Sequence, residues 1–166
     1  MRTVNVEQLT TDDFLPFGFY ADILGARSER IGVPPIEFYR DQVQQDLGVA
    51  SRVSFSNCRI GWRPLVIDVT EMHSTCGEGA MPLDNDMLLH VIPASPPGTG
   101  PDLAKARVFC VPAGTMVVLR AGVWHHAPFT PNRRPVNVLI SLPERTYAND
   151  CHLMKLPRNQ RITIKL

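Results

Sequence analysis

The sequence predicts an all-β protein, and three observations support this fold class. The chain has 15 prolines among 166 residues, which interrupt it too often for long helices. Short apolar segments alternate hydrophobic and polar residues at the two-residue period of a strand, and turn residues separate these segments. Many short strands in a chain of this length indicate a β-sandwich or a closed barrel, which also removes exposed sheet edges.

The composition is that of one globular domain and gives no sign of a nucleic-acid or membrane partner. Hydrophobic residues make up 44% and charged residues 20%, and the net charge is +1 without a basic stripe or an acidic tail. No apolar run approaches the roughly 20 residues of a membrane span, and no secretory signal is visible, so we expect a cytoplasmic protein. Residues 1–166 are expected to form a single domain whose barrel core covers about residues 50–157. The four cysteines form no CxxC pair and are expected to be free thiols.

The N-terminal segment predicts an edge strand followed by a short helix. Thr3–Leu9 alternates loosely and is expected to lie at the edge of a sheet. Thr10 is a good N-cap, and Asp13 places an acidic side chain in the first helical turn. Pro16 and Gly18 then keep the helix short.

The rest of the chain has the pattern of a β-protein, apart from Ile36–Asp46, which fits a strand, a short helix or both. Pro93–Pro101 is rich in proline and glycine and is expected to be a surface loop. His152–Leu156 and Arg161–Leu166 are expected as edge strands. The main strands are expected at Arg52–Cys58, Leu65–His73, Met87–Ile92, Arg107–Val111, Thr115–Leu119 and Val136–Leu142.

Two separate segments carry residues that could bind a metal. Glu71 and His73 are two positions apart on a predicted strand, and Glu78 follows after a turn of small residues. His125 and His126 follow a glycine turn, and strand alternation lets only one of them face a given interior. Carboxylate and imidazole ligands together suit a divalent ion such as Mn, Fe, Ni or Zn.

Each of these residues also has a structural interpretation. Glu71 and His73 could occupy an ordinary polar strand face, and a backbone carbonyl could hold His125 within a core. His126 is expected to be structural because alternation turns it away from its neighbour. Arg120 could be a surface charge or could bind a carboxylate in bidentate fashion.

The spacing of these residues resembles the two motifs of the cupin superfamily. The first motif matches Glu71-x-His73-x4-Glu78, with a glutamate in place of its first histidine. The second starts at Gly114 and runs through Arg120-Ala121-Gly122 to His125, with arginine in place of proline. This resemblance implies a cupin-type double-stranded β-helix, or jelly-roll barrel, with a short N-terminal helix.

A closer resemblance is to the ureidoglycolate lyase family of cupins. It rests on Val123–Phe129, on Glu71–His73 and on Pro101–Leu103, which are colinear with the pattern of that family. The family resemblance implies a homodimer that splits ureidoglycolate into glyoxylate and urea in purine catabolism, during allantoin degradation. Glu78 stands where the family usually has glutamine, and Arg120-Ala121 stands where it has His-Arg.

We therefore expect a lyase that acts on ureidoglycolate or a related small ureido or hydroxy acid. The alternatives are a metal-dependent cupin of other chemistry, such as an isomerase or oxygenase, and a non-catalytic small-ligand-binding cupin. The expected metal ligands are Glu71, His73, Glu78 and His125, with no other cofactor. Glu78, His125 and Arg120 are the expected catalytic residues. Glu78 is left open as ligand or base, and Arg120 would pair with the substrate carboxylate. A homodimer is expected to form through the edge strand Arg161–Leu166.

Overall fold

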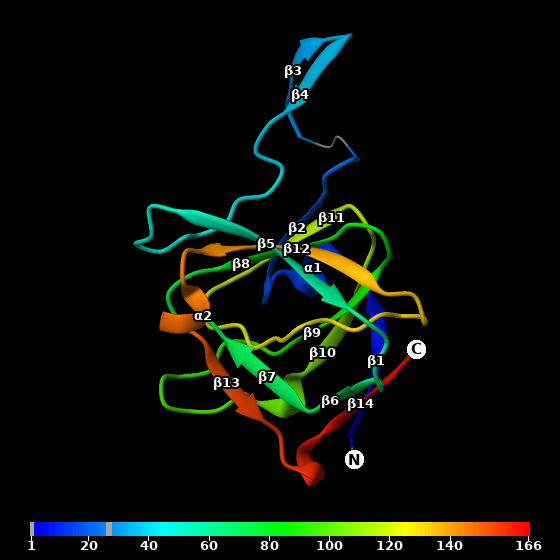
Figure 1. Cartoon of the computed structure of the whole chain (residues 1–166), viewed down its shortest axis with the longest axis vertical. Coiled ribbons are helices and arrows are strands. Elements are labelled where there is room, and N and C mark those ends of the chain that lie inside the picture. The colour runs from blue at the N-terminus through cyan, green and yellow to red at the C-terminus, as the bar shows by residue number, and fades with distance from the viewer. Residues whose placement is uncertain (1, 26–27) are drawn as a thin grey trace.

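The computed structural model describes residues 2–25 and 28–166 and shows a mostly β protein built around two five-stranded sheets (Figure 1). The first sheet has the strand order β6 (Val66–Ile67), β14 (Ile162–Lys165), β1 (Arg2–Gln8), β10 (Arg107–Val111), β9 (Met87–Val91). The second has the order β2 (Gly18–Asp22), β11 (Thr115–Leu119), β8 (Glu78–Pro82), β12 (Val136–Pro143), β5 (Val53–Ile60). Together they form a nearly closed barrel, as the all-β cupin prediction requires.

Shorter elements complete the fold. β7 (Val69–Met72) pairs with β13 (His152–Lys155), and β3 (Arg30–Val33) pairs with β4 (Ile36–Tyr39). The helical pieces are α1 (Thr11–Phe14), α2 (Thr146–Asn149) and the 3-10 turns Leu103–Lys105 and Arg158–Gln160. No helix among the described residues is long and apolar enough to cross a membrane.

Two hydrophobic clusters lie on opposite faces of β9. Met87, Leu89 and Val91 point into the first cluster, which fills the space between the two large sheets. Leu88 points the other way, into a second cluster that includes Phe129. Strand alternation explains this division, because successive side chains project to opposite faces.

The short N-terminal helix forms as predicted. The Thr10 hydroxyl accepts a hydrogen bond from the backbone N–H of Asp13 at 3.2 Å, which caps α1. Phe14 and Phe17 are buried, and their rings lie 5.4 and 5.9 Å from that of Phe109 on β10. The helix is thereby fixed to the barrel by aromatic contacts.

Two predicted edge strands are instead interior strands. β1 pairs in parallel with both β14 and β10, and β14 lies between β1 and β6. The predictions that Thr3–Leu9 and Arg161–Leu166 lie at an edge are therefore wrong. Alternation identifies a buried face, here that of Ile162 and Ile164, but it does not show whether both edges are paired.

Some strands were not predicted. β2 and β8 lie in segments for which no strand was expected, and the expected strand Leu65–His73 is divided into β6 and β7. The Gln45 side chain packs closely against β8 at Gly79. A Cβ at Gly79 would lie 3.1 Å from Gln45 Oε1. Close packing, rather than strand propensity, accounts for the glycine here.

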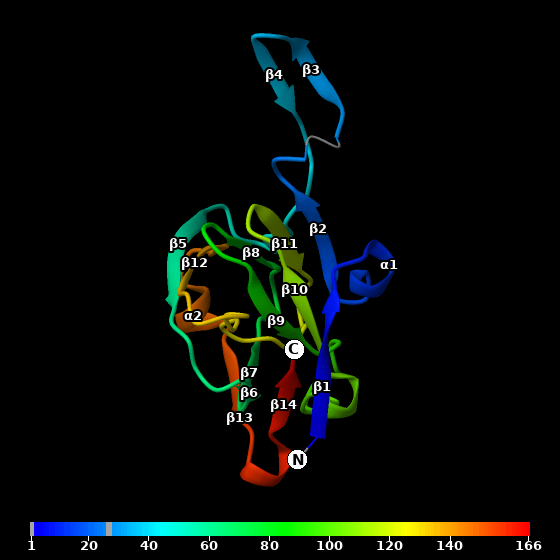
Figure 2. The same ribbon diagram turned by 90° about the vertical axis from the view of Figure 1, so that its right-hand side faces the viewer.

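β3 and β4 form a hairpin, here called the arm, that projects well away from the barrel (Figures 1 and 2). Residues that lie opposite each other on the two strands point to the same face of the hairpin. One of the two faces is therefore entirely apolar, and it is exposed. It consists of Ile31, Val33, Ile36 and Phe38. The other face carries an Arg30–Glu37 ion pair. Residues 36–39 are thus a strand, and residues 40–46 form neither helix nor strand.

Candidate metal and catalytic site

A cavity of about 250 Å³ lies at the centre of the barrel, with an apolar wall and a polar end. Leu89, Leu119 and Ile140 form part of the wall, so the two large sheets both contribute. The polar end is formed by Glu71, Glu78, His125, His126 and Tyr147. The described lining contains no lysine or arginine.

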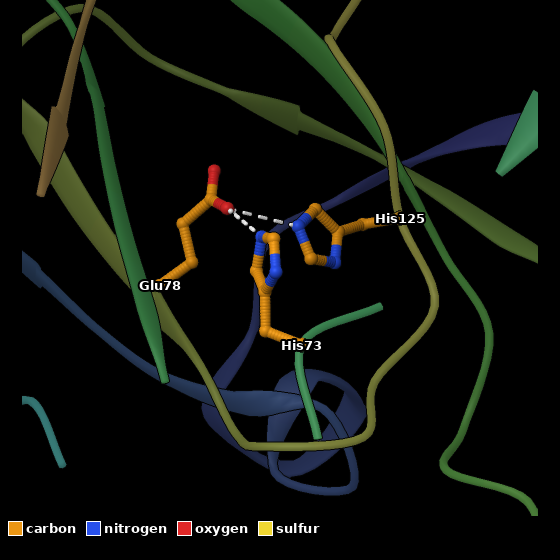
Figure 3. A group of neighbouring side chains, drawn as sticks. All are labelled: His73, Glu78 and His125. Carbon is orange, nitrogen blue, oxygen red and sulfur yellow. Dashed lines mark hydrogen bonds and ion pairs between the residues drawn. The ribbon is translucent and has the colours of Figure 1, made fainter. Parts of the chain in front are cut away.

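Three buried side chains converge at the polar end: His73, Glu78 and His125. Figure 3 shows the two rings and the carboxylate pointing toward one another. The Oε2 atom of Glu78 lies 3.0 Å from His73 Nε2 and 3.1 Å from His125 Nε2. The three potential ligand atoms all lie within 4.8 Å of one another.

The backbone brings these residues together from distant parts of the sequence. His125 and Glu71 exchange two backbone hydrogen bonds, of 2.5 and 2.7 Å, which fix the second histidine segment against β7. The N–H of Gly122 donates to the carbonyl of His73 at 2.6 Å. Gly122 has a φ of +80°, a conformation that favours glycine, so the predicted glycine turn does direct His125 into the barrel.

Backbone carbonyls fix the tautomers of both rings. Nδ1–H of His73 donates to the Asp150 carbonyl at 2.6 Å, and Nδ1–H of His125 donates to the Val123 carbonyl at 2.9 Å. A carbonyl can only accept, so each Nδ1 must carry a proton. Each Nε2 therefore either presents a lone pair to Glu78 or is protonated as part of an imidazolium. Two lone pairs facing a carboxylate oxygen require a positive charge between them.

The pKa shifts of the cluster show that protons on the two rings can supply this positive charge. Burial alone would raise the pKa of Glu78, but the charges and hydrogen bonds of His125 and His73 lower it to about 2. Burial would lower the pKa of His73 and His125, but Glu78 and the two carbonyls raise both above their ordinary value. Glu78 is consequently a carboxylate throughout the neutral range.

The residues present fit a divalent metal ion. Two imidazole nitrogens and one carboxylate oxygen form a mixed donor set that suits Mn, Fe, Ni or Zn. The Nδ1–H bonds to carbonyls are the outer contacts that usually orient metal-binding histidines. A metal would also supply the positive charge that the facing Nε2 and Oε2 atoms require.

Glu71 lines the same cavity but lies outside the group of three. Its Oε2 accepts a hydrogen bond from the Cys151 thiol at 3.1 Å. Burial, with the hydrogen bond and charge of Glu71, raises the pKa of Cys151 to about 12, so this thiol remains protonated. Of the four residues expected to bind a metal, His73, Glu78 and His125 form one cluster, and Glu71 lies outside this cluster in the cavity lining.

The prediction that His126 turns away from the cavity is wrong, while a structural role for this residue stays a prediction. Both His125 and His126 line the cavity, because the chain at this point forms only isolated bridges and does not alternate as a regular strand. Burial lowers the pKa of His126, and the positive charges of Arg63 and His125 add to this effect. His126 is therefore a neutral imidazole at neutral pH.

Arg120 does not reach the cavity. Its guanidinium lies 4.3 Å from the centre of the exposed Phe19 ring, and its Nε donates to the Leu15 carbonyl at 3.4 Å. It lines a separate hollow of about 480 Å³ on the outer side of β11. Arg120 directly follows β11 and points outward. Its position therefore does not support the expected pairing with a substrate carboxylate inside the barrel.

Tyr147 was missed by the sequence argument. It lies on α2, lines the cavity, and its ring centre is 5.9 Å from that of His73. Burial, together with the negative charges of Glu78 and Glu71, raises the pKa of Tyr147. Its hydroxyl therefore stays protonated. The sequence around α2 contains no motif that points to the barrel interior.

Comparisons with known proteins identify the family. The sequence profile of the ureidoglycolate lyase family matches residues 1–163. A ureidoglycolate lyase of Pseudomonas syringae pv. tomato is 27% identical over 169 residues, covering 99% of this chain and 96% of that protein. One from Brucella abortus is 30% identical over 129 residues, covering 76% and 75%.

Among solved structures, Bacillus subtilis oxalate decarboxylase, a protein with Mn(II) centres, has 15% identity and a TM-score of 0.41. The match covers 76% of this chain but only 35% of that chain, so this protein spans about a third of its length. The full-length profile match and the relatives in two bacteria lead to one conclusion: this chain is a member of the ureidoglycolate lyase family.

Proposed function

We propose that this enzyme cleaves ureidoglycolate into glyoxylate and urea, and that the central cavity is its active site. The observation that carries the proposal is the convergence of His73, Glu78 and His125 inside the barrel of a chain that belongs to this lyase family. Cleavage of this substrate is a step in purine breakdown.

The reaction requires a base and an acid. A base removes the proton of the substrate hydroxyl, the oxygen forms the carbonyl of glyoxylate, and the C–N bond breaks. An acid then protonates the nitrogen that leaves with urea. Because Glu78 has a pKa of about 2, it is a poor base at neutral pH and is better suited to hold a cation with His73 and His125.

Two other residues of the cavity suit the proton transfers. His126 is neutral, since burial lowers its pKa, and can accept the hydroxyl proton. Tyr147 keeps its proton, since partial burial and the charges of Glu78 and Glu71 raise its pKa, and can donate to the leaving nitrogen. Glu71 contributes a further carboxylate for the N–H groups of the ureido end. A neutral His126 and a protonated Tyr147 thus provide the base and the acid that the reaction requires.

We propose Mn, Fe, Ni or Zn as the metal held by His73, Glu78 and His125. The cavity lining contains two carboxylates and, among its described residues, no lysine or arginine. An anionic substrate therefore needs another positive partner. A bound divalent ion would polarise an oxygen of the substrate and compensate the negative charge of its carboxylate.

The test is release of urea and glyoxylate by the wild type and by the variants Glu78→Ala and His125→Ala. We expect each variant to lose at least about a hundredfold in kcat, since each removes a group from the catalytic cluster. Glu37→Ala, which removes a carboxylate on the arm, is the matched control and should keep full activity. Wild-type rates in both cluster variants would exclude this site.

We further propose that the enzyme is a homodimer joined through the arm rather than through Arg161–Leu166, since β14 is paired on both edges. An isolated two-stranded hairpin is only marginally stable in water. Its apolar face, comprising Ile31, Val33, Ile36 and Phe38, has no cover among the described residues. A second copy presents the same face, so two-fold pairing of two arms would cover both apolar faces at once. A cytoplasmic location remains a prediction from the sequence.

A further inference from the structure

Asp150 lies just after α2 and binds a turn that is distant in sequence. Its Oδ1 accepts hydrogen bonds from the backbone N–H and the hydroxyl of Ser74, at 2.8 and 2.6 Å. Its Oδ2 accepts the equivalent two bonds from Thr75, at 2.8 and 2.6 Å. One carboxylate therefore satisfies four donors, and its side chain is only 11% exposed.

The same residue presents a backbone carbonyl to the cluster. The Asp150 carbonyl accepts the Nδ1–H of His73 at 2.6 Å, and the Asp150 N–H donates to the Thr146 carbonyl at 2.8 Å. The carbonyl that orients His73 thus belongs to a residue that is held by α2 through its N–H and by the turn through its carboxylate. These two anchors hold the Cα of Asp150 in place beside the ring of His73.

The turn that Asp150 binds also connects two members of the cluster. His73 immediately precedes Ser74, and Glu78 begins β8 three residues after Thr75. The carboxylate of Asp150 therefore fixes the chain between the imidazole and the carboxylate that must meet. His125 is held differently, by the Val123 carbonyl two residues away and by the backbone bonds to Glu71.

We propose that Asp150 is a positioning residue of the active site, which sets the ring orientation and tautomer of His73 and the distance between His73 and Glu78. The inference rests on the proposed function and adds a residue that acts on the cluster without touching the substrate. Groups that orient histidine ligands commonly contribute about 10- to 100-fold to metal affinity or activity.

The test compares wild type, Asp150→Asn and Asp150→Ala in two measurements. The first is 15N NMR of the histidine rings in chelator-treated protein, which reports the protonated nitrogen of His73 without substrate or metal. We expect the variants to lose the defined Nδ1–H signal of His73 and to keep that of His125. The second is the steady-state rate, for which we expect kcat to fall about 10- to 100-fold with a smaller change in KM.

Asp84→Ala is the matched control, because Asp84 also accepts a backbone and a side-chain hydrogen bond, from Asn137, on the exposed surface. It should leave the His73 signal and kcat unchanged. If Asp150→Ala does not fold, Ser74→Ala and Thr75→Ala each remove one hydroxyl donor and should show smaller changes of the same kind. A folded Asp150→Ala with the wild-type His73 signal and kcat would overturn the inference. Absence of urea release by the wild type would remove the proposed function, while the NMR comparison would still decide the role of Asp150.

Discussion

At the scale of single residues, Asp150 links acid stability to the geometry of the site. Burial alone would raise its pKa, but the hydrogen bonds from Ser74 and Thr75 lower it well below the ordinary value. A lowered folded-state pKa stabilises the protein above the unfolded-state pKa, about 3.9 for aspartate, and this stabilisation is lost as the pH falls further.

We therefore expect Asp150→Asn to lower the free energy of unfolding by about 1–3 kcal/mol at pH 7, since buried donors lose a charged acceptor. The difference from wild type should stay constant above about pH 5 and shrink as the pH falls below about 4. Urea denaturation at several pH values measures it. A difference that grows toward acid pH would contradict this account.

The position of Arg120 gives a second prediction at this scale. Its guanidinium packs on Phe19 outside the barrel, so Arg120→Ala should change KM for ureidoglycolate by less than about twofold. Initial-rate kinetics test this directly. A tenfold or larger increase in KM would mean that Arg120 reaches the substrate after all.

The central residues of the site could be chosen from the sequence because their spacing reflects chemistry. The expected cluster included Glu71, His73, Glu78 and His125, and the structure brings ligand atoms of the last three within 4.8 Å of one another. Their roles as metal ligands stay a prediction. The positions of His126 and Tyr147 were not predictable, because they depend on a local departure from strand alternation and on how α2 docks.

At the scale of elements, burial was predictable but pairing was not. Alternation correctly identified the N-terminal and C-terminal strands, yet both were assigned to an edge. Their interior place depends on a parallel pairing between β1 and β14, whose residues lie at opposite ends of the chain. A hydrophobic pattern carries no information about such a partner. β8 was missed for a related reason, since its Gly79 reflects close packing of the Gln45 side chain, which is distant in sequence.

The interior position of β14 predicts a large effect for a core substitution there. Ile162 is 1% exposed within the second cluster, so Ile162→Ala should lower the free energy of unfolding by about 2–5 kcal/mol. Leu166→Ala, at a position 68% exposed, is the control and should change it by less than about 0.5 kcal/mol. Chemical denaturation measures both. Equal effects would argue against an interior β14.

At the scale of the whole molecule, the arm determines the expected assembly. Ile36→Asp combined with Phe38→Asp places charges on its apolar face and should convert a dimer into a monomer. Light scattering at micromolar protein concentration gives the mass. Val49→Asp, which adds a charge at an exposed position outside the arm, should leave the mass unchanged. A wild-type monomer, or a dimer in the double variant, would refute the arm interface.

Metal binding should also be visible in global stability. A ligand that binds only the folded state, present at 100 times its Kd, raises the free energy of unfolding by about 2.7 kcal/mol. We expect Mn²⁺ added to chelator-treated protein to give such an increase, and His125→Ala to remove it. Thermal denaturation with and without the ion measures the change. An identical shift in wild type and variant would place the metal elsewhere.

The double-sided burial of β9 has a consequence for how the molecule opens. Its five residues are all buried, and the four hydrophobic ones divide between the two clusters, so neither cluster can loosen without exposing this strand. Backbone amides of β9 should therefore exchange with deuterium only through complete unfolding, among the slowest in the chain. Both halves of the interior would then melt in one transition, as a single cooperative unit does.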